Sequence, residues 1–316
     1  MDAGERPFHI PVLLSETLEA IAPRANGRYL DGTLGLGGHA GAILASAPGS
    51  ELCGLDRDGE ALAVARERLR AYGGRAHLFH ARYSSFGDCL KALGWERIDG
   101  ALLDVGVSSL QLDEGGRGFS FSNDGPLDMR MDRHSGEISA WHWVNRESLA
   151  RLRECIATFG EEPQAGRIAR HIVEARQKAC INTTAELAAL VEKAYPPAWR
   201  ARARRHPATR TFQALRMAVN DELGELERFL REILAWLPVG GRLAVITFHS
   251  LEDRMVKHVM RGWARCLSTP FDSRGRPEVR LLHKKPVRPG EDELANNPRA
   301  GSAKMRAVEK IAEAAA

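Results

Sequence analysis

The stretch that decides the fold reads Asp31-Gly32-Thr33-Leu34-Gly35-Leu36-Gly37-Gly38-His39-Ala40-Gly41. It lies between an expected strand at residues 28–31 and an expected helix at residues 40–45. Glycines let the backbone adopt positive φ and approach a ligand closely, and the helix that follows offers free N–H groups at its N-terminus. Gly35, Gly37 and Ala40 also have the spacing of the dinucleotide-binding fingerprint. The stretch therefore predicts a nucleotide-like ligand at the end of the first strand.

Strand-like and helix-like segments alternate around this loop. Apolar runs at residues 51–56, 76–80 and 98–104 are typical of strands, and residues 60–72 carry apolar side chains at helical spacing. The alternation returns near the C-terminus, with a long helix expected at 211–237, a strand at 242–248, a helix at 251–263 and a late strand at 278–283. This pattern predicts an α/β fold with right-handed crossovers and a parallel sheet.

Residues 113–208 interrupt the alternation. They contain no convincing strand, and helices are expected at 146–159, 164–178 and 184–194. We therefore expect one α/β core formed by residues 1–112 and 209–316. An inserted all-helical domain, residues 113–208, is expected to recognise the substrate.

The composition excludes several classes of protein. The 45 Lys and Arg residues exceed the 41 Asp and Glu residues by only four, which permits nucleic-acid binding without requiring it. We find no apolar run long enough to span a membrane and no signal peptide in residues 1–11. The five cysteines form no CxxC pair, and the histidines show no metal-ligand spacing. We expect a cytoplasmic protein with buried thiols, no metal and no stable protein partner.

Asp31, Asp56 and Asp104 each end an expected strand, at the edge where α/β proteins bind ligands. Asp56 follows the glycine loop by about 20 residues, where an acid accepts hydrogen bonds from ribose hydroxyls. No Lys follows the glycines, which disfavours a phosphate-binding loop for phosphoryl transfer. Carboxylates suit the cationic S-adenosylmethionine better than the pyrophosphate of NAD, so the residues favour S-adenosylmethionine as the cofactor.

Residues 104–113 follow the fourth expected strand. Methyltransferases of exocyclic amines commonly carry an acid, two prolines and an aromatic there, and this chain has only the acid, Asp104. The block alone therefore does not establish amine methylation. The candidates to accept a hydrogen bond or a proton from a target amine are Asp104, Ser108, Ser109 and His249.

Two further interpretations concern side chains near these candidates. We expect His249 to face the cleft and Ser250 to cap the helix that follows. Phe119 and Phe121 are candidates either to stack on a base or to anchor their own loop.

Cations gather between the insertion and the core and again near the C-terminus. Such runs either form a solvated face or contact the phosphates of a nucleic acid. The candidate RNA-binding residues are Arg202, Arg204, Arg205, His206, Arg210, Arg254, Arg299, Lys304 and Arg306.

Seven blocks of the chain resemble the bacterial 16S ribosomal RNA cytosine-N4 methyltransferase family (RsmH, formerly MraW). They are residues 9–14, 31–39, 104–113, 118–132, 206–212, 248–254 and 297–306. The resemblance implies a Rossmann-like class I methyltransferase sheet. It also implies methyl transfer from S-adenosylmethionine to N4 of a cytosine at the P site of the decoding centre, within the small ribosomal subunit.

The same resemblance implies a set of cofactor contacts. They fall on Gly37, Gly38, His39, Asp56, Tyr83, Asp104 and Gln111, to which the glycine-loop argument adds Asp31 and Gly35.

Two other functions fit parts of the sequence. An NAD-dependent oxidoreductase would use the glycine loop and bind no nucleic acid. A non-catalytic RNA-binding assembly factor would bind RNA whether or not S-adenosylmethionine is present. Residues 104–113 disfavour the first function, and the intact glycine loop disfavours the second.

Overall fold

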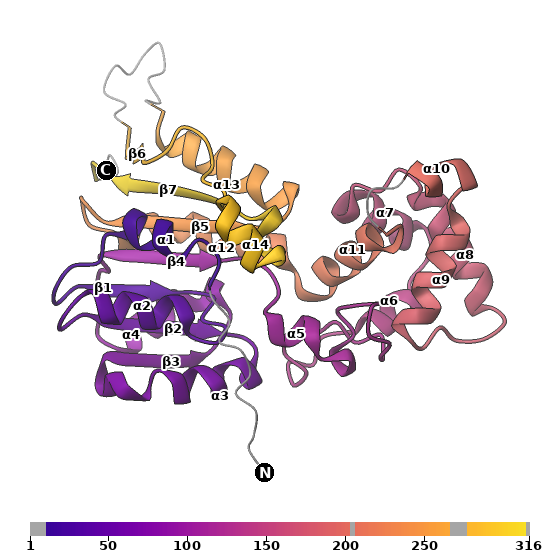
Figure 1. Cartoon of the computed structure of the whole chain (residues 1–316), viewed down its shortest axis with the longest axis horizontal. Coiled ribbons are helices and arrows are strands. Elements are labelled where there is room, and N and C mark those ends of the chain that lie inside the picture. The colour runs from indigo at the N-terminus through magenta and orange to yellow at the C-terminus, as the bar shows by residue number, and fades with distance from the viewer. Residues whose placement is uncertain (1–10, 203–205, 266–276, 314–316) are drawn as a thin grey trace. The chain divides into compact units, whose positions relative to one another are not determined.

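A computed structural model of the protein describes residues 11–202, 206–265 and 277–313. The chain divides into unit 1, residues 1–106 with 224–316, and unit 2, residues 107–223 (Figure 1). These boundaries differ from the predicted 113 and 208. Residues 208–220 form a helix whose apolar side chains belong to the core of unit 2, so the inserted unit extends further along the chain than its composition suggested.

Unit 1 is built on a sheet that, in the described residues, has seven strands in the order β3-β2-β1-β4-β5-β7-β6. The first five strands are parallel, and β7 runs antiparallel to β5 and β6. The strands are β1 (Arg28–Asp31), β2 (Glu51–Asp56), β3 (Ala76–His80), β4 (Gly100–Asp104), β5 (Arg242–Thr247), β6 (Val279–Leu281) and β7 (Lys304–Lys310). The predicted α/β fold with a parallel Rossmann-like sheet is confirmed.

Helices cover both faces of this sheet (Figure 1). Side chains along a strand alternate between two cores, so Leu30 packs in one core and its neighbour Tyr29 in the other. The helices of unit 1 are α1 (Leu14–Ile21), α2 (Gly38–Ser46), α3 (Gly59–Arg68), α4 (Phe86–Ala92), α12 (Glu222–Trp236), α13 (Ser250–Trp263) and α14 (Glu291–Asn296), with the 3-10 turns η1 (Arg70–Arg75), η2 (Tyr83–Ser85) and η4 (Pro298–Ser302). Burial on both faces leaves the ends of the strands as the place for polar groups.

Several expected elements differ from the structure. The prediction of one long helix at 211–237 is wrong: α11 (Ala208–Asn220) ends just before Asp221, whose φ is 49°, and α12 begins at the residue after Asp221. The apolar stripe continues across this break at helical spacing, so the sequence pattern gives no sign that one helix ends and another begins. In unit 1, helices α1, α4 and α14 and strand β7 were not predicted.

Unit 2 is helical, and its described residues form no strand beyond a single bridge between Pro126 and Thr183. Its helices pack around a core that includes Ile156, Ile168 and Leu215. They are α5 (Ser109–Asp113), α6 (Ala140–Arg146), α7 (Leu149–Gly160), α8 (Ala165–Arg176), α9 (Thr184–Ala194), α10 (Pro197–Arg202) and α11, with the 3-10 turn η3 (Gly115–Arg117).

The long segment between η3 and α6 is fastened to this core by Asn220. The Asn220 Oδ1 atom accepts a hydrogen bond from the Met131 N–H at 2.9 Å, and its Nδ2 atom donates to the Met129 and Arg216 carbonyls at 2.8 Å each. The side chain is fully buried, so water cannot replace these bonds.

No described helix has both the length and the apolar character needed to cross a membrane. Cys53, Cys89 and Cys155 are buried as predicted, whereas Cys180 is exposed, and Cys266 lies outside the described residues. Burial raises the pKa of the Cys53 and Cys155 thiols, as expected of structural rather than reactive cysteines.

Asn220→Ala is expected to lower the free energy of unfolding by about 2–4 kcal/mol, because it leaves the Met131 N–H and the Met129 carbonyl buried without partners. Urea unfolding followed by circular dichroism measures the change. Asn123→Ala, at an exposed position of the same segment, is the control. Equal midpoints for the two variants would contradict this account of the segment.

Candidate functional site

The glycine loop is bonded to the end of strand β2. The Leu34 N–H donates to the Leu55 carbonyl at 2.8 Å, and the Gly35 N–H donates to Asp56 Oδ2 at 2.7 Å. Gly35 and Gly37 have φ values of 51° and 75°, which other residues adopt at a cost. Glycine therefore allows the conformation of this loop, and Asp56, the last residue of β2, holds its backbone in place.

Asp56 has a second contact of the same kind. Its Oδ1 atom accepts a hydrogen bond from the Asp58 N–H at 2.8 Å. Burial raises the Asp56 pKa to about 6, and the two backbone N–H donors oppose that rise. Each oxygen keeps a further lone pair, so a contact with ribose hydroxyls is compatible with this position.

The carboxyl groups of Asp31 and Asp104 lie at the ends of two neighbouring central strands, β1 and β4. Thr33 contacts both residues: its N–H donates to Asp31 Oδ1 at 3.2 Å, and its hydroxyl accepts from the Asp104 N–H at 2.6 Å. Asp31 Oδ2 and Asp104 Oδ1 are buried and have no hydrogen-bond partner among the described residues. Two unpartnered carboxylate oxygens in one place are costly in the absence of a ligand.

Burial dominates the electrostatics of this pair. It raises the Asp31 pKa to about 7 and the Asp104 pKa to about 8, and the charge of Asp31 contributes to the rise at Asp104. A cation with N–H donors would supply the missing hydrogen bonds and favour the ionised carboxylates. The donor set therefore fits the ammonium end of S-adenosylmethionine, the cofactor expected from the sequence.

Three other predicted cofactor residues lie around these acids in unit 1. His39 is buried, with Nε2 3.0 Å from the Val12 carbonyl and Nδ1 3.9 Å from Asp104 Oδ2. A Cβ on Gly38 would lie 2.3 Å from Pro11, so this glycine permits close packing of the N-terminal segment. Tyr83 packs edge-on against Phe229 and lies beside Gly32.

The predicted helix cap at Ser250 is wrong by one residue. His249, not Ser250, is the N-cap of α13: its Nδ1 atom accepts from the Glu252 N–H at 3.4 Å, and Glu252 Oε2 accepts from the His249 N–H at 3.3 Å. The His249 Nε2 atom lies 2.9 Å from Glu252 Oε1. Both ring nitrogens thus face Glu252, a fully buried acid that the sequence analysis missed.

The predicted residues after strand β4 also form a helix cap. Ser108 and Gln111 make a reciprocal capping box at the start of α5, with distances of 3.3 and 3.1 Å. Ser109 is the first residue of that helix, and its side chain lies outside the description. Polar residues placed three apart after a strand are the signal that identifies this cap.

Phe119 and Phe121 anchor their loop within unit 2. Phe119 belongs to the core of the unit, and Phe121 packs against His206 and Phe212 with ring centroids 4.6 and 5.0 Å apart.

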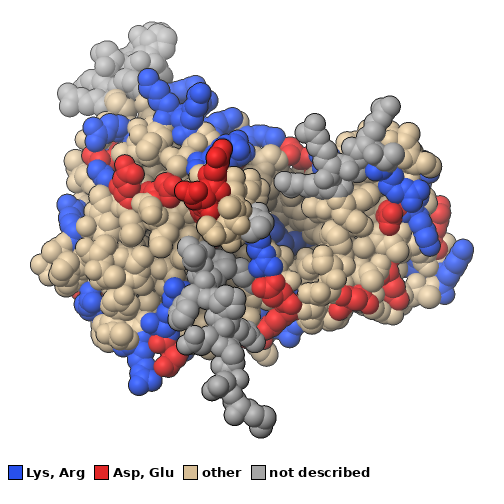
Figure 2. Space-filling model, in the orientation of Figure 1, with Lys and Arg blue, Asp and Glu red and all other residues tan. Residues whose placement is uncertain are grey.

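The candidate RNA-binding cations have different surroundings. Asp253 accepts from Lys304 at 3.1 Å and from Arg306 at 2.7 Å, whereas Arg254 and Arg299 are exposed. Figure 2 shows basic side chains over α13 and acidic ones near α14. In unit 2, Arg210 donates to the Glu161 carbonyl at 2.9 Å, and His206 is exposed. The side chain of Arg202, and all of Arg204 and Arg205, lie outside the described residues.

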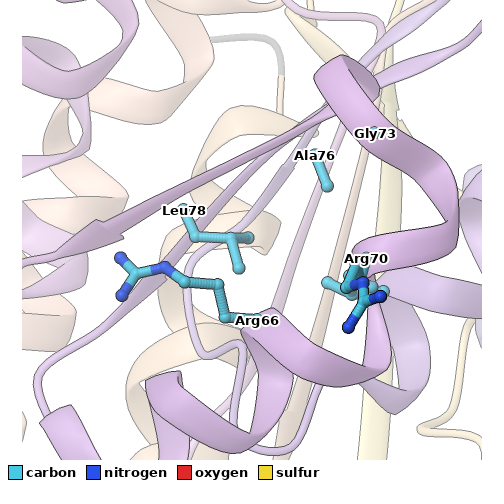
Figure 3. Close-up of a pocket in the computed structure, with 6 residues that line it drawn as sticks. Arg66, Arg70, Gly73, Ala76 and Leu78 are labelled. Carbon is cyan, nitrogen blue, oxygen red and sulfur yellow. The ribbon is translucent and has the colours of Figure 1, made fainter.

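A separate cavity of about 300 Å³ lies along α3 and strand β3 (Figure 3). It is lined by Arg66, Leu69, Arg70, Gly73, Ala76 and Leu78, none of which the sequence predicted as a cofactor or RNA contact. The predicted cofactor residues of unit 1 instead gather at the carboxyl ends of the strands.

The strand order, the antiparallel β7 and the acids at the ends of β1, β2 and β4 define a class I methyltransferase, a class whose methyl donor is S-adenosylmethionine. A family model described as the MraW methylase family matches residues 6–311, and the chain belongs to that family. This membership excludes the oxidoreductase alternative.

Relatives match almost the whole chain. Proteins named "Ribosomal RNA small subunit methyltransferase H" are 71% identical in Desulfovibrio desulfuricans, over 99% of this chain and 97% of the relative, and 63% identical in Nitratidesulfovibrio vulgaris, over 98% of each. The protein of that name from Lawsonia intracellularis is 55% identical, over 96% of this chain and 99% of its own.

The raised pKa values of Asp31 and Asp104 predict a pH dependence of stability. In the unfolded chain both carboxyls titrate near pH 4, so between about pH 4 and pH 8 the folded state binds more protons, and the free energy of unfolding falls as pH rises. Each carboxyl contributes up to about 1.4 kcal/mol per pH unit in its range.

Asp104→Asn is expected to flatten this slope for the ligand-free protein, measured by urea unfolding at intervals from pH 5 to pH 8. Asp88→Asn changes an exposed acid of the same unit and should leave the slope unchanged. Parallel slopes for wild type and Asp104→Asn would contradict the burial of an unpartnered carboxyl at this position.

Proposed function

We propose that the protein transfers a methyl group from S-adenosylmethionine to N4 of a P-site cytosine in 16S ribosomal RNA, within the small ribosomal subunit in the cytoplasm. The observation that carries the proposal is the pair of unpartnered carboxylate oxygens, on Asp31 and Asp104, beside the glycine loop. The proposal is supported by membership of the MraW methylase family and by relatives named for small-subunit ribosomal RNA.

In unit 1, different acids would hold the ammonium group and the ribose of the cofactor. Asp31 and Asp104 offer unpartnered oxygens to its ammonium group, and Asp56 offers lone pairs to its ribose. Gly35, Gly37, Gly38, His39 and Tyr83 are the other proposed cofactor residues of unit 1. The family resemblance adds Gln111 as a proposed cofactor contact. When bound, S-adenosylmethionine supplies an electrophilic methyl group.

The protein must compensate for a weak nucleophile. The lone pair of the cytosine amine is delocalised into the ring, so the enzyme gains most from holding nitrogen and methyl carbon in line at about 3 Å. A hydrogen-bond acceptor at the amine would localise the lone pair and later take the proton. The target base must leave its stack to reach such a site.

Asp104, Ser108, Ser109 and His249 remain the proposed acceptors. The hydroxyl of Ser108 and the ring of His249 have capping contacts, whereas Asp104 Oδ1 has no partner among the described residues. The Asp104 oxygen that would hold the ammonium group cannot also accept from the amine, so Ser108, Ser109 and His249 are the proposed acceptors where Asp104 holds the cofactor.

RNA binding is proposed for both units. The cations Arg202, Arg204, Arg205, His206 and Arg210 of unit 2, with Arg254, Arg299, Lys304 and Arg306 of unit 1, are the proposed backbone contacts. The helical unit 2, rather than the residues 113–208 predicted from the sequence, is the proposed substrate-recognition domain.

Asp104→Asn is expected to weaken S-adenosylmethionine binding at least tenfold, because a neutral amide loses the attraction to the ammonium group. Isothermal titration calorimetry measures the affinity, and Asp88→Asn should bind as the wild type does. An unchanged affinity for Asp104→Asn would remove Asp104 from the cofactor site.

The reaction itself is tested with methyl-labelled S-adenosylmethionine. Small subunits and protein-free 16S RNA, both from cells lacking this activity, are the substrates, and the labelled nucleoside is identified after digestion. N4-methylated cytidine from subunits is the expected product. Label in another nucleoside, or in neither substrate while the cofactor still binds, would overturn the proposed target.

A further inference from the structure

Residues 126–132 form a loop with a strained backbone at Met129, and the proposed reaction assigns this loop no role. Met129 is fully buried with φ at 60°, a conformation that costs a non-glycine residue about 1 kcal/mol or more. Such strain persists only where the surrounding structure over-determines it, and it gathers at functional sites.

The loop is held from the inside of unit 2 by two buried polar side chains. Asn220 bonds the backbone of Met129 and Met131, and Arg117, which is 1% exposed, donates to the Met131 carbonyl at 2.8 Å. A Cβ on Gly118 would lie 2.1 Å from the Pro126 carbonyl oxygen, so the segment also folds tightly onto itself. The loop can therefore present its outer side chains in fixed positions.

The side chain that this loop fixes is Arg130. Its Nε atom donates to Asp128 Oδ1 at 2.6 Å and its Nη2 atom donates to Asp128 Oδ2 at 3.1 Å. One edge of the guanidinium is thus occupied. The Nη1 atom makes no hydrogen bond to any residue in the described chain, and 24% of the side chain is exposed. The other edge of the guanidinium, formed by Nη1 and the second Nη2 hydrogen, can therefore donate two hydrogen bonds to a ligand.

A planar pair of N–H donors fits two partners in RNA: a phosphate, or the O6 and N7 atoms of guanine. The local charge favours the base. Asp128 neutralises Arg130, Asp132 and Glu137 add negative charge close by, and Arg133 offsets part of it from 4.0 Å away from Asp128. Arg117 adds a third guanidinium, with its Nη2 atom 3.4 Å from the Arg130 carbonyl oxygen. These three acids and three arginines leave no net positive charge that would favour an anionic phosphate over a neutral base edge.

We propose that Arg130, held in place by Asp128, binds the O6 and N7 edge of an unpaired guanine in the RNA substrate. The inference rests on the proposed function in that it takes RNA as the substrate. It assigns unit 2 a sequence-reading contact in addition to its backbone contacts.

Binding is tested on the full-length protein with four fluorescent 12-nucleotide pyrimidine RNAs. Their central residue is guanosine, inosine, 7-deazaguanosine or adenosine. Inosine keeps both O6 and N7, whereas 7-deazaguanosine lacks N7 and adenosine lacks O6. We expect the wild type to bind the guanosine and inosine RNAs roughly 5- to 150-fold more tightly than the other two.

Two variants separate base reading from charge. Arg130→Lys keeps the cation but loses the planar pair of donors, and Asp128→Asn keeps the guanidinium but weakens its clamp. Both variants should therefore discriminate less between the four RNAs than the wild type does. Arg153→Lys, at an exposed position of α7, is the matched control and should discriminate as the wild type does. Thermal melting of each variant verifies the fold.

Equal binding of the four RNAs by the wild type would overturn the proposal. So would an Arg130→Ala variant that weakens all four equally and lowers the salt slope by about one, because that is the signature of a phosphate contact. The assay needs no turnover, so its failure is distinct from a failure of the methylation assay to label cytidine.

Discussion

Two carboxyl groups that each bury one oxygen without a partner, at the ends of β1 and β4, are the constraint on which the rest of unit 1 depends. Burying an ionised carboxylate costs several kcal/mol, so the ligand-free protein raises the pKa of Asp31 and Asp104 instead. Thr33 links the two strand ends, and Asp56 holds the glycine loop in place beside them. Because helices cover both faces of the sheet, polar side chains are left at the carboxyl ends of its strands.

The sequence predicted strands correctly where an apolar run ends in an acidic residue. Strands β1, β2 and β4 each end in an acid, and the glycine loop follows the first of them, so their positions and the edge they share were predictable. Strand β7 has alternating burial, but its Lys and Arg residues resemble a basic tail. The break at Asp221 was hidden because its left-handed backbone leaves the apolar stripe uninterrupted on both sides.

Several of the predicted site residues have a structural role at the start of a helix. Ser108 and His249 were predicted as polar residues after strands, and Gln111 as a contact implied by the family resemblance; all three take part in capping the helix that begins there. A strand end that leads into a helix needs such a cap whether or not it binds a ligand. Sequence spacing cannot separate a cap from a ligand contact, and the unpartnered oxygens of Asp31 and Asp104 support the proposal that these two residues bind a ligand.

The position of β7 has a consequence for how the chain is made. This strand lies between β5 and β6 in the sheet, yet it is the last to leave the ribosome. Residues 107–223 form a continuous segment, so all of unit 2 has been made before strand β5, whereas the sheet of unit 1 is complete only once residue 310 has been made. During synthesis β5 therefore has an unpaired edge, open to non-native pairing until the C-terminal strand closes it.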